Sequence, residues 1–201
     1  MNIAVFASGK GTNFSAIIKA VKKGVIKDNL SLLVCDNPKA GAIGRAKRAG
    51  IKVALVKRED FAARNDFEVA IIRRLKEEKI DLIILAGFMR IIGEDILNYY
   101  KNRIINIHPA LLPSFKGAHA IKDAFDYGVK VTGVTVHFVD EKTDHGPIIL
   151  QQVVKIEEDD TLETLETKIH KIEHKLYPQA VKLFVEGKLK IEGRKVRILT
   201  Q

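Results

Sequence analysis

The sequence predicts an α/β protein with a mostly parallel, twisted sheet, helices on both faces and an antiparallel C-terminal part. Strand-like apolar runs recur through the first half of the chain, and helical patterns lie between most of them. Alternation of this kind is typical of β-α-β units. After Gly117 the pattern changes to segments in which apolar and polar residues alternate, which predicts the antiparallel part.

The first half of the chain contains five expected strands. They cover Ile3–Ala7, Ser31–Cys35, Lys52–Val56, Asp81–Ala86 and Arg103–His108. Residues 82–85 are all apolar, which favours a central parallel strand buried on both faces. Helices are expected over Thr12–Lys23 and Phe67–Lys79, because apolar residues recur there at intervals of three and four. These elements build the parallel part of the sheet.

The second half is expected to begin with an antiparallel strand pair. Apolar and polar residues alternate over Val131–Val139 and again over Ile148–Ile156. The turn-rich segment Asp140–Pro147 separates them. We predict that this segment is a functional loop.

A long helix is expected to follow. Asp160 can cap it, with Glu163 three residues later completing a capping box. Its buried stripe would consist of Leu162, Leu165, Ile169, Ile172 and Leu176. We expect Pro178 to kink or break the helix and Gly187 to end it. The tail from Lys188 predicts a last pair of strands that turns at Glu192-Gly193.

Length and composition predict one soluble domain over residues 1–201. Hydrophobic residues make up 46% of the chain and charged residues 29%, which is ordinary for a globular protein. No apolar run approaches the roughly 20 residues that span a bilayer, so no membrane partner is expected. The single cysteine, Cys35, excludes an intramolecular disulfide and fits a reducing cytoplasm.

The formal net charge of +9 has two interpretations. A basic surface attracts anionic partners such as phosphate, polyglutamate or nucleic acid. The basic residues are spread along the whole chain, however, and no arginine-rich tail is present. This favours a lysine-rich solvated surface that contributes to anionic small substrates, without a nucleic-acid partner.

A glycine-rich segment, Ser8–Asn13, lies between the first strand and the first helix. Glycines let backbone amides approach an anion, and a helix N-terminus supplies partial positive charge. The segment differs from a dinucleotide fingerprint, because Phe14 stands where the third glycine would be, and it lacks the Lys-Ser/Thr of a P-loop. It predicts a phosphate site; the alternative is a tight turn without a ligand.

The central strand runs into a second candidate segment, Leu85–Ile92. Gly87 lets the chain turn, and an apolar loop then leads into a helix. The carboxyl edge of a parallel sheet is where ligands of α/β proteins bind. The segment predicts a hydrophobic slot for a flat heterocycle; the alternative is a buried strand–helix connection.

The third candidate combines Asn106 and His108 with Asp144. Strand residues two apart point to the same face, so Asn106 and His108 share one face at the end of their strand. Pro109 cannot donate a ladder hydrogen bond and ends that strand. An amide, an imidazole and a carboxylate can supply oxyanion and acid–base groups, which suggests acyl-type transfer. Each residue could instead be structural.

The fourth candidate is His170-Lys171-Ile172-Glu173-His174, which has the H-x-x-E-H spacing of inverted zinc proteases. Such spacing places both imidazoles on one helical face. A third ligand would be needed, and the flanking helix supplies none clearly. A zinc hydrolase therefore stays open as an alternative from another reaction class.

Taken together, these residues resemble the phosphoribosylglycinamide formyltransferase family, the folate-dependent enzymes of purine synthesis. The similarity covers nearly the whole chain. It is carried by residues 8–13, 85–90, 106–109, 111–113, 136–139, 144–148 and 173–178. The pattern Asn106-x-His108 with a downstream aspartate is shared by folate formyltransferases in general, so it indicates only that larger group. The loop ending in Thr12-Asn13 and the helix segment at Glu173 resemble the glycinamide ribonucleotide enzymes more specifically.

The resemblance implies a Rossmann-like formyltransferase fold and a set of site residues. Asn106, His108 and Asp144 would be catalytic. Gly11, Thr12 and Asn13 would hold the ribonucleotide phosphate, while Glu173 would bind the glycinamide amine and His170 would lie in the same substrate segment. The folate site would be lined by Arg64, Met89, Arg90, Ile91, Ile92 and Asn106 and by the closing loop Asp140, Glu141, Lys142, Thr143 and Asp144.

The implied reaction transfers the formyl group of 10-formyltetrahydrofolate to the amine of 5'-phosphoribosylglycinamide in de novo purine biosynthesis. The expected partners are these two small molecules, with no metal and with a monomer or homodimer as the assembly. One alternative is a formyltransferase for another amine, such as a nucleotide sugar. A non-catalytic phosphate-binding domain and the zinc hydrolase are the others.

Overall fold

The computed structural model describes residues 1–199, which fall into two compact units, Met1–Ile105 and the part from Asn106 onward. Each unit is described by itself. The prediction of one domain over residues 1–201 stays a prediction. Within residues 1–199, no helix is long and apolar enough to cross a membrane.

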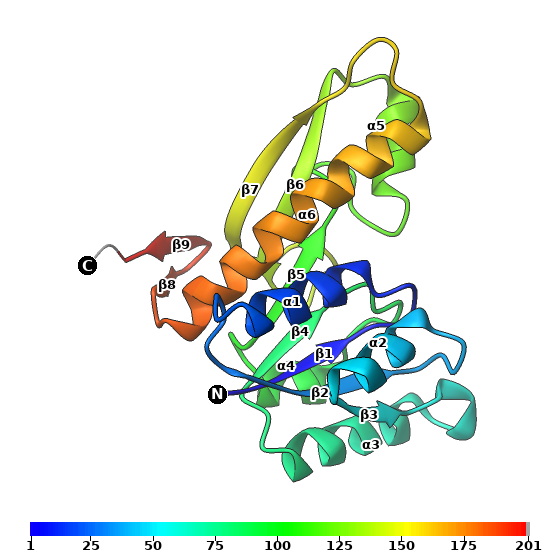
Figure 1. Cartoon of the computed structure of the whole chain (residues 1–201), viewed down its shortest axis with the longest axis vertical. Helices are drawn as coiled ribbons and strands as arrows, with labels where there is room; N and C mark the ends of the chain where they lie inside the picture. The colour runs from blue at the N-terminus through cyan, green and yellow to red at the C-terminus, as the bar shows by residue number, and fades with distance from the viewer. Residues whose placement is uncertain (200–201) are drawn as a thin grey trace. The chain divides into compact units, whose positions relative to one another are not determined.

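Four parallel strands form the sheet of the first unit (Figure 1). They are β1 (Asn2–Phe6), β2 (Asn29–Cys35), β3 (Lys52–Leu55) and β4 (Leu82–Leu85). Their order across the sheet is β3-β2-β1-β4. A fifth strand, β5 (Ile104–His108), begins in this unit and ends in the second. The predicted strands are confirmed, with ends that differ by one or two residues.

Helices connect these strands. They are α1 (Thr12–Lys22), α2 (Gly41–Ala49), the short 3-10 helix η1 (Arg58–Asp60), α3 (Arg64–Glu77) and α4 (Glu94–Tyr99). α1 packs against α2, and α3 packs against α4. The chain crosses the sheet in one direction from β1 to β3 and returns from β3 to β4. Because such crossovers are right-handed, the two helix pairs cover opposite faces.

The second unit contains the antiparallel part. β6 (Val131–Phe138) and β7 (Ile148–Lys155) pair antiparallel, for example Val134 with Gln152. β8 (Leu189–Glu192) and β9 (Lys195–Ile198) form the predicted C-terminal hairpin. The strand order is β5-β6-β7-β9-β8, and β9 pairs parallel to β7 where Lys195 meets Ile148. The predicted fold class is confirmed.

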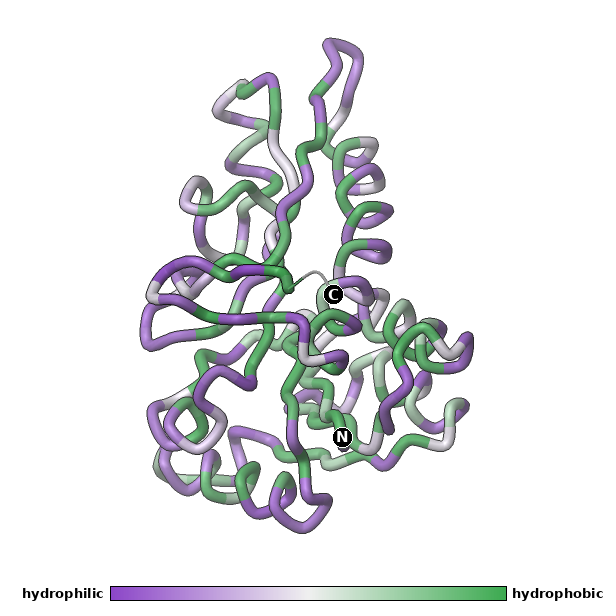
Figure 2. Tube along the Cα trace, turned by 90° about the vertical axis from the view of Figure 1, so that its left-hand side faces the viewer, coloured by the Kyte–Doolittle hydropathy of each residue, from purple (hydrophilic) through white to green (hydrophobic). Residues whose placement is uncertain are grey.

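Two helices pack in the second unit. α6 (Leu162–Val185) lies along β6 and β7, and α5 (Ala120–Tyr127) contacts α6 (Figure 1). α5 falls in a region for which the sequence pattern predicted no element. In Figure 2 hydrophobic and hydrophilic residues alternate along the helical turns, as expected of helices that each bury one side.

Each unit buries large apolar side chains. In the first unit the fully buried side chains include Phe6, Phe14, Ile17, Leu33, Leu75 and Leu82. In the second unit they include Val134, Phe138, Leu165, Ile169, Tyr177 and Val181. Complete burial of such a side chain contributes about 1.5–3 kcal/mol. The two halves of the chain therefore each supply apolar packing around their own strands.

The start of α6 corrects one prediction. The helix is capped by Thr161, whose side chain accepts from Thr164 N at 3.2 Å, and Thr164 Oγ1 accepts from Thr161 N at 2.9 Å. The predicted box of Asp160 and Glu163 is wrong by one residue. Asp160 instead accepts hydrogen bonds from Glu157 N and Thr164 Oγ1, both at 2.8 Å. These bonds and Lys168 Nζ lower the pKa of Asp160 to about 2, with Lys168 as the largest cause.

The prediction was that Pro178 would kink or break α6, and the helix is not broken there. The helix continues from Leu162 to Val185 with Pro178 inside it. A proline inside a helix removes one backbone donor and crowds the carbonyl four residues earlier. Pro178 and the side chains next to it, Leu176 and Tyr177, are nevertheless all buried. Packing of this stripe maintains the helix. It ends at Glu186, followed by Gly187 with φ +66°, as predicted.

Candidate active site

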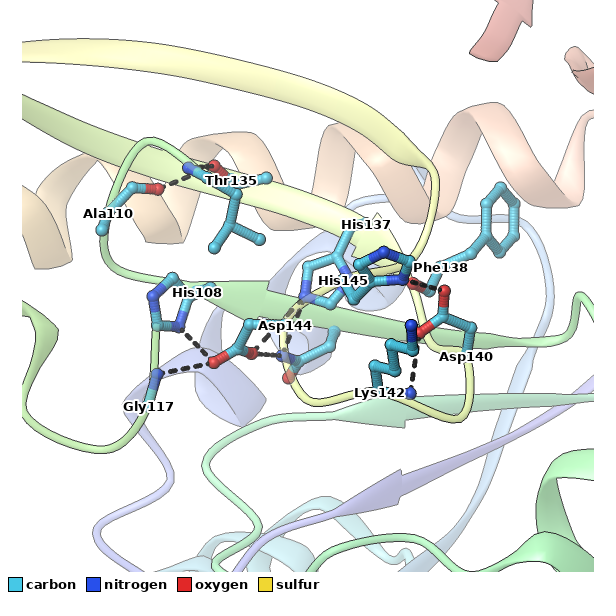
Figure 3. A network of polar contacts seen from close by, with 12 residues as sticks. His108, Ala110, Gly117, Thr135, His137, Phe138, Asp140, Lys142, Asp144 and His145 are labelled. Carbon is cyan, nitrogen blue, oxygen red and sulfur yellow. Dashed lines mark hydrogen bonds and ion pairs between the residues drawn. The ribbon is translucent and has the colours of Figure 1, made fainter. Parts of the chain in front are cut away.

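Asn106 and His108 both reach the carboxylate of Asp144. Asn106 Nδ2 lies 3.5 Å from Asp144 Oδ1, and His108 Nδ1 lies 3.4 Å from Asp144 Oδ2. Figure 3 shows the His108 and Asp144 side chains pointing toward one another. The prediction that Asn106 and His108 share a face of β5 is confirmed, because both contact one carboxylate. The structure brings the three predicted catalytic residues together.

Asp144 lies in the loop that connects β6 to β7, and its backbone is in the left-handed region with φ +47°. This conformation is costly for a residue with a side chain, although aspartate tolerates it better than most. Gly117 N donates to Asp144 Oδ2 at 2.8 Å. The carboxylate is therefore held by a strong backbone contact, and it makes three long side-chain contacts, to Asn106, to His108 and, at 3.8 Å, to His137 Nε2. Only the long ones involve Asn106 and His108.

The buried ring of His108 is surrounded by acceptors at both nitrogens. Nε2 lies 2.8 Å from Phe115 O, and since a carbonyl oxygen only accepts, Nε2 must carry the hydrogen. Nδ1 faces the carboxylate of Asp144. A neutral ring would offer a lone pair to that carboxylate, whereas an imidazolium donates from both nitrogens. Nε2 is therefore the nitrogen that donates to Phe115 O, and Nδ1 is the nitrogen that faces the carboxylate of Asp144.

His137, which the sequence analysis did not select, fixes the orientation of Asn106. His137 Nδ1 donates to Phe138 O at 2.8 Å, so in the neutral ring Nε2 is an acceptor, and it accepts from Asn106 Nδ2 at 3.2 Å. Burial lowers the pKa of His137, which favours this neutral form. The sequence signal was a histidine on a predicted strand next to the loop that carries Asp144, but nothing in the pattern showed that its ring faced Asn106.

Thr135 stabilises the segment that follows His108. Its hydroxyl donates to Ala110 O at 2.7 Å and accepts from Leu112 N at 3.1 Å (Figure 3). Gln151 Nε2 donates to the same hydroxyl at 2.9 Å. Thr135 is completely buried, so these bonds satisfy a polar group that would otherwise destabilise the fold. They connect the loop after β5 to β6 and β7.

In the glycine-rich loop of the first unit, a left-handed glycine stands directly before α1. Gly11 precedes α1 with φ +72°, and a Cβ added there would lie 2.9 Å from the Cβ of Ala42. Arg45 donates to Lys10 O at 2.8 Å and to Ser15 Oγ at 2.7 Å, which fixes the loop against the first turn of α1. The first amides of a helix lack intrahelical acceptors and attract anions. Thr12 and Asn13 begin this helix.

The loop after β4 is held by backbone contacts to Ser8. Met89 N donates to Ser8 Oγ at 2.9 Å, and Ser8 N donates to Gly87 O at 3.0 Å. Met89 and Ile91 remain about 70% exposed, whereas Ile92 is buried. Exposed apolar side chains on a fixed loop suit contact with a flat apolar ligand. Ile92 faces the protein interior instead.

Two arginines predicted for the folate site contact the protein around this loop. Arg90 Nε donates to the buried Asp36 at 2.7 Å. Arg64 Nε donates to Glu68 at 2.8 Å, and its other end donates to Ile91 O at 3.1 Å. Both guanidinium groups are about half exposed. They therefore position the loop and still present part of their charge to solvent.

Glu173 is a buried carboxylate on α6. His170 Nδ1 lies 2.8 Å from Glu173 Oε2, and the His170 side chain is about half exposed. The rings of His170 and His174 stack with centroids 6.5 Å apart, so both imidazoles share a helical face as the zinc hypothesis required. In the part of the chain that the structure describes, no three His, Cys, Asp or Glu side chains are grouped as metal ligands.

Comparison with known proteins decides the family. The formyl transferase family model matches residues 1–181. The chain belongs to the formyl transferase family. It is 49% identical over 179 residues to the phosphoribosylglycinamide formyltransferase of Bacillus subtilis, covering 89% of this chain and 92% of that protein.

Solved structures agree with this family. The glycinamide ribonucleotide transformylase 1 of Symbiobacterium toebii has a TM-score of 0.97 and 44% identity, covering 100% of this chain and 94% of that one. The phosphoribosylglycinamide formyltransferase of Bacillus halodurans has a TM-score of 0.90 and 46% identity, covering 92% of this chain and 95% of that one. The predicted resemblance is confirmed.

Proposed function

We propose that this chain transfers a formyl group from 10-formyltetrahydrofolate to the amine of 5'-phosphoribosylglycinamide, in de novo purine biosynthesis. The observation that carries the proposal is the convergence of Asn106 and His108 on the carboxylate of Asp144. The names of the relatives indicate the acceptor and the formyl transfer. The identity of the formyl donor rests on the resemblance of the sequence motifs.

The first step is attack of the neutral amine nitrogen on the formyl carbon. A carbon–nitrogen bond forms, and the carbonyl electron pair moves to the formyl oxygen, which becomes an oxyanion. Asn106 Nδ2 and a protonated His108 are the proposed donors to this oxygen. Their contacts to Asp144, at 3.5 and 3.4 Å, are long and weak. A substrate oxygen can replace them at small cost.

The second step breaks the bond between the formyl carbon and N10 of the folate. The oxyanion re-forms the carbonyl, and the electron pair of the broken bond goes to N10, which takes up a proton from His108. The attacking amine gives up one proton to His108, directly or through water, which restores the protonated ring. Asp144 favours the imidazolium form of His108 by its negative charge and orients the ring, directly or through water. The proposed chemistry uses these side chains without a covalent enzyme intermediate.

His137 acts as a positioning residue in this proposal. Its neutral Nε2 accepts from Asn106 Nδ2, which keeps the NH₂ end of the amide directed toward Asp144. The opposite flip of the amide would present an oxygen, which cannot donate to an oxyanion. Neutral His137 therefore selects the productive orientation of Asn106.

In the first unit, Gly11, Thr12 and Asn13 are the proposed phosphate ligands. The left-handed Gly11 and the start of α1 supply backbone amides and partial positive charge. Met89 and Ile91 would contact the folate through their exposed side chains, and the half-exposed Arg64 and Arg90 would offer positive charge. Ile92 would support this loop from beneath, because it is buried.

In the second unit, Glu173 is the proposed ligand of the substrate amine. Its carboxylate is buried and contacts His170 Nδ1 at 2.8 Å, which gives it a fixed orientation. A buried carboxylate binds an amine more strongly than an exposed one. The loop residues Asp140, Glu141, Lys142, Thr143 and Asp144 would close over the folate.

The test is a formyl-transfer assay with purified protein, 10-formyltetrahydrofolate and glycinamide ribonucleotide, in the presence of a metal chelator. Formation of the formylated ribonucleotide and tetrahydrofolate is expected. Absence of product with this acceptor, together with product from a nucleotide-sugar amine, would favour the other formyltransferase. Activity that the chelator abolishes would favour metal chemistry. The cytoplasmic location and the monomer or homodimer remain predictions.

A further inference from the structure

The loop that carries Asp144 connects β6 to β7, and its two ends lie next to each other. Its two ends are joined by a hydrogen bond from Phe138 N to Pro147 O at 2.9 Å. At Gly146 the chain passes so close to Phe138 that an added Cβ would lie 1.9 Å from Phe138 O. The base of the loop is therefore fixed, while residues 140–145 extend beyond it. Asp144 lies in the extended part, with φ +47°.

A side-chain contact spans this extended part. His145 Nδ1 lies 2.7 Å from Asp140 Oδ2, as Figure 3 shows, and Lys142 N donates to Asp140 Oδ1 at 3.1 Å. Both contacts join loop residues to each other. They give the loop internal structure, but they do not attach it to the strands. Asp144 itself has a left-handed conformation, which costs about 1–3 kcal/mol when unsupported. Gly117 N holds its carboxylate, and a contact to the loop backbone would restrain the conformation further.

Arg194, in the turn of the C-terminal hairpin, makes such a contact. Its guanidinium donates to His145 O at 2.6 Å, and a second nitrogen lies 3.3 Å from both ring nitrogens of His145. The carbonyl of His145 belongs to the residue directly after Asp144. A charge-assisted bond to this carbonyl restrains the peptide between His145 and Gly146, one residue beyond the left-handed Asp144.

The hairpin itself is well anchored. β8 and β9 pair over four residue pairs, and Gly193 with φ +60° makes the turn before Arg194. Lys195, the next residue, pairs with Ile148 at the start of β7. The register therefore places Arg194 beside the end of the loop. Arg197 in the same hairpin contacts Glu192 at 2.7 Å, within the hairpin.

We propose that Arg194 is a positioning residue for the formyl-transfer reaction, because it fixes the loop peptide that aims the Asp144 carboxylate at His108 and Asn106. The inference rests on the proposed role of Asp144. Arg194 would touch neither substrate. It acts through the backbone of His145, so its effect should appear in the rate of the chemical step more than in the binding of glycinamide ribonucleotide.

The first experiment compares Arg194→Ala with Arg197→Ala by steady-state kinetics. Arg194→Ala should lower kcat by about 10- to 100-fold, the range expected when a reacting group is displaced by about an ångström. The KM for glycinamide ribonucleotide should change less than about twofold. Arg197→Ala, the matched control, should keep wild-type kcat. Arg194→Lys should restore part of kcat, since it can donate one bond to His145 O. An unchanged kcat in Arg194→Ala would overturn the inference.

The second experiment is a double-mutant cycle with Asp144→Asn. If Arg194 acts by aiming the Asp144 carboxylate, Arg194→Ala should have little further effect once that carboxylate is gone. An equal fold-loss in both backgrounds would mean that Arg194 acts independently, which refutes the inference and leaves the function of Asp144 intact. Wild-type activity of Asp144→Asn itself would contradict the proposed role of Asp144, whereas absence of formyl transfer by the wild-type protein would contradict the proposed function. The two failures are therefore distinguishable.

Discussion

His108 Nδ1 lies 3.4 Å from Oδ2 of Asp144, while Nε2 of the same ring lies only 2.8 Å from Phe115 O. The short contact fixes the ring, and the long contact leaves its other nitrogen weakly bound. A contact of this length is weak, so a substrate oxygen can replace it at small cost. Nε2 of His108 thus makes the structural contact, and Nδ1 is the nitrogen proposed to take part in the reaction.

Asp144→Asn should lower kcat by about 10²- to 10⁴-fold, the usual contribution of acid–base catalysis. The substitution keeps the shape and the left-handed tolerance of the residue but removes the charge that favours an imidazolium at His108. Steady-state formyl-transfer kinetics measure the effect, with thermal unfolding as a check on folding. Asp126→Asn, an exposed change on α5, serves as the control. Unchanged turnover in Asp144→Asn would remove Asp144 from the mechanism.

His137→Phe should lower kcat by about 10- to 100-fold, because Asn106 loses the acceptor that orients its amide. His137→Gln should keep more activity, since the glutamine oxygen can stand near the position of Nε2. The comparison of the two variants tests hydrogen bonding separately from ring packing. Equal losses in both would indicate that the acceptor does not matter.

Stability should depend on pH through His137. Burial lowers the pKa of the folded His137 below its ordinary value of 6.5. Above about pH 6.5 the ring is neutral in both the folded and the unfolded chain, so His137 no longer changes the free energy of unfolding as the pH rises. As the pH falls below 6.5 the unfolded chain binds the proton first, so the free energy of unfolding declines until the folded-state pKa is reached. Urea unfolding at pH 5 to 8 should show this decline in wild type, with a shallower slope in His137→Gln.

Glu173→Ala should raise the KM for glycinamide ribonucleotide by about tenfold or more, the loss expected for a hydrogen bond to a charged group. The KM for the folate should change little. Glu166→Ala is the control, because Glu166 lies on the exposed side of the same helix. A parallel rise in both KM values would show that Glu173 is not specific to the amine substrate.

Gly11→Ala should destabilise the protein by about 1–3 kcal/mol and raise the KM for glycinamide ribonucleotide. The added Cβ would meet Ala42 at 2.9 Å in a backbone with φ +72°. Gly9→Ala, two residues earlier, meets no atom within 4 Å and should be tolerated. Chemical denaturation and steady-state kinetics of both variants measure the difference. Equal behaviour of the two would contradict a special role for Gly11.

The parallel strands were predictable from their apolar runs, and β6 and β7 from the alternation of apolar and polar residues. α2 and α5 were missed, since the side chains they bury fully are alanines, Ala42 and Ala46 in α2 and Ala120 and Ala124 in α5. Small buried residues leave weak apolar periodicity. The predicted cap of α6 was one residue too early. Asp160 and Thr161 are both good cap residues, and only the geometry distinguishes them.

The part of the site on β5 was predictable, because residues of suitable chemistry stand there at the spacing of one strand face. Asn106 and His108 share a face because strands have a two-residue period. Nothing local indicated that His137 orients Asn106 or that Arg194 contacts the carbonyl of His145, which is 49 residues away in sequence. Such contacts depend on strand register, which a single sequence does not reveal.

The sequence by itself determined the alternation of strands and helices, the types of residue proposed for the reaction, and the family. Each of these depends on residues that are close together in the sequence. Only the tertiary structure decided which atoms face one another. It brings Asp144 to Asn106, 38 residues earlier, and assigns the hydrogen of His137 to Nδ1 through Phe138 O. Catalytic alignment depends on distances of tenths of an ångström, and these arise from packing and register between distant segments.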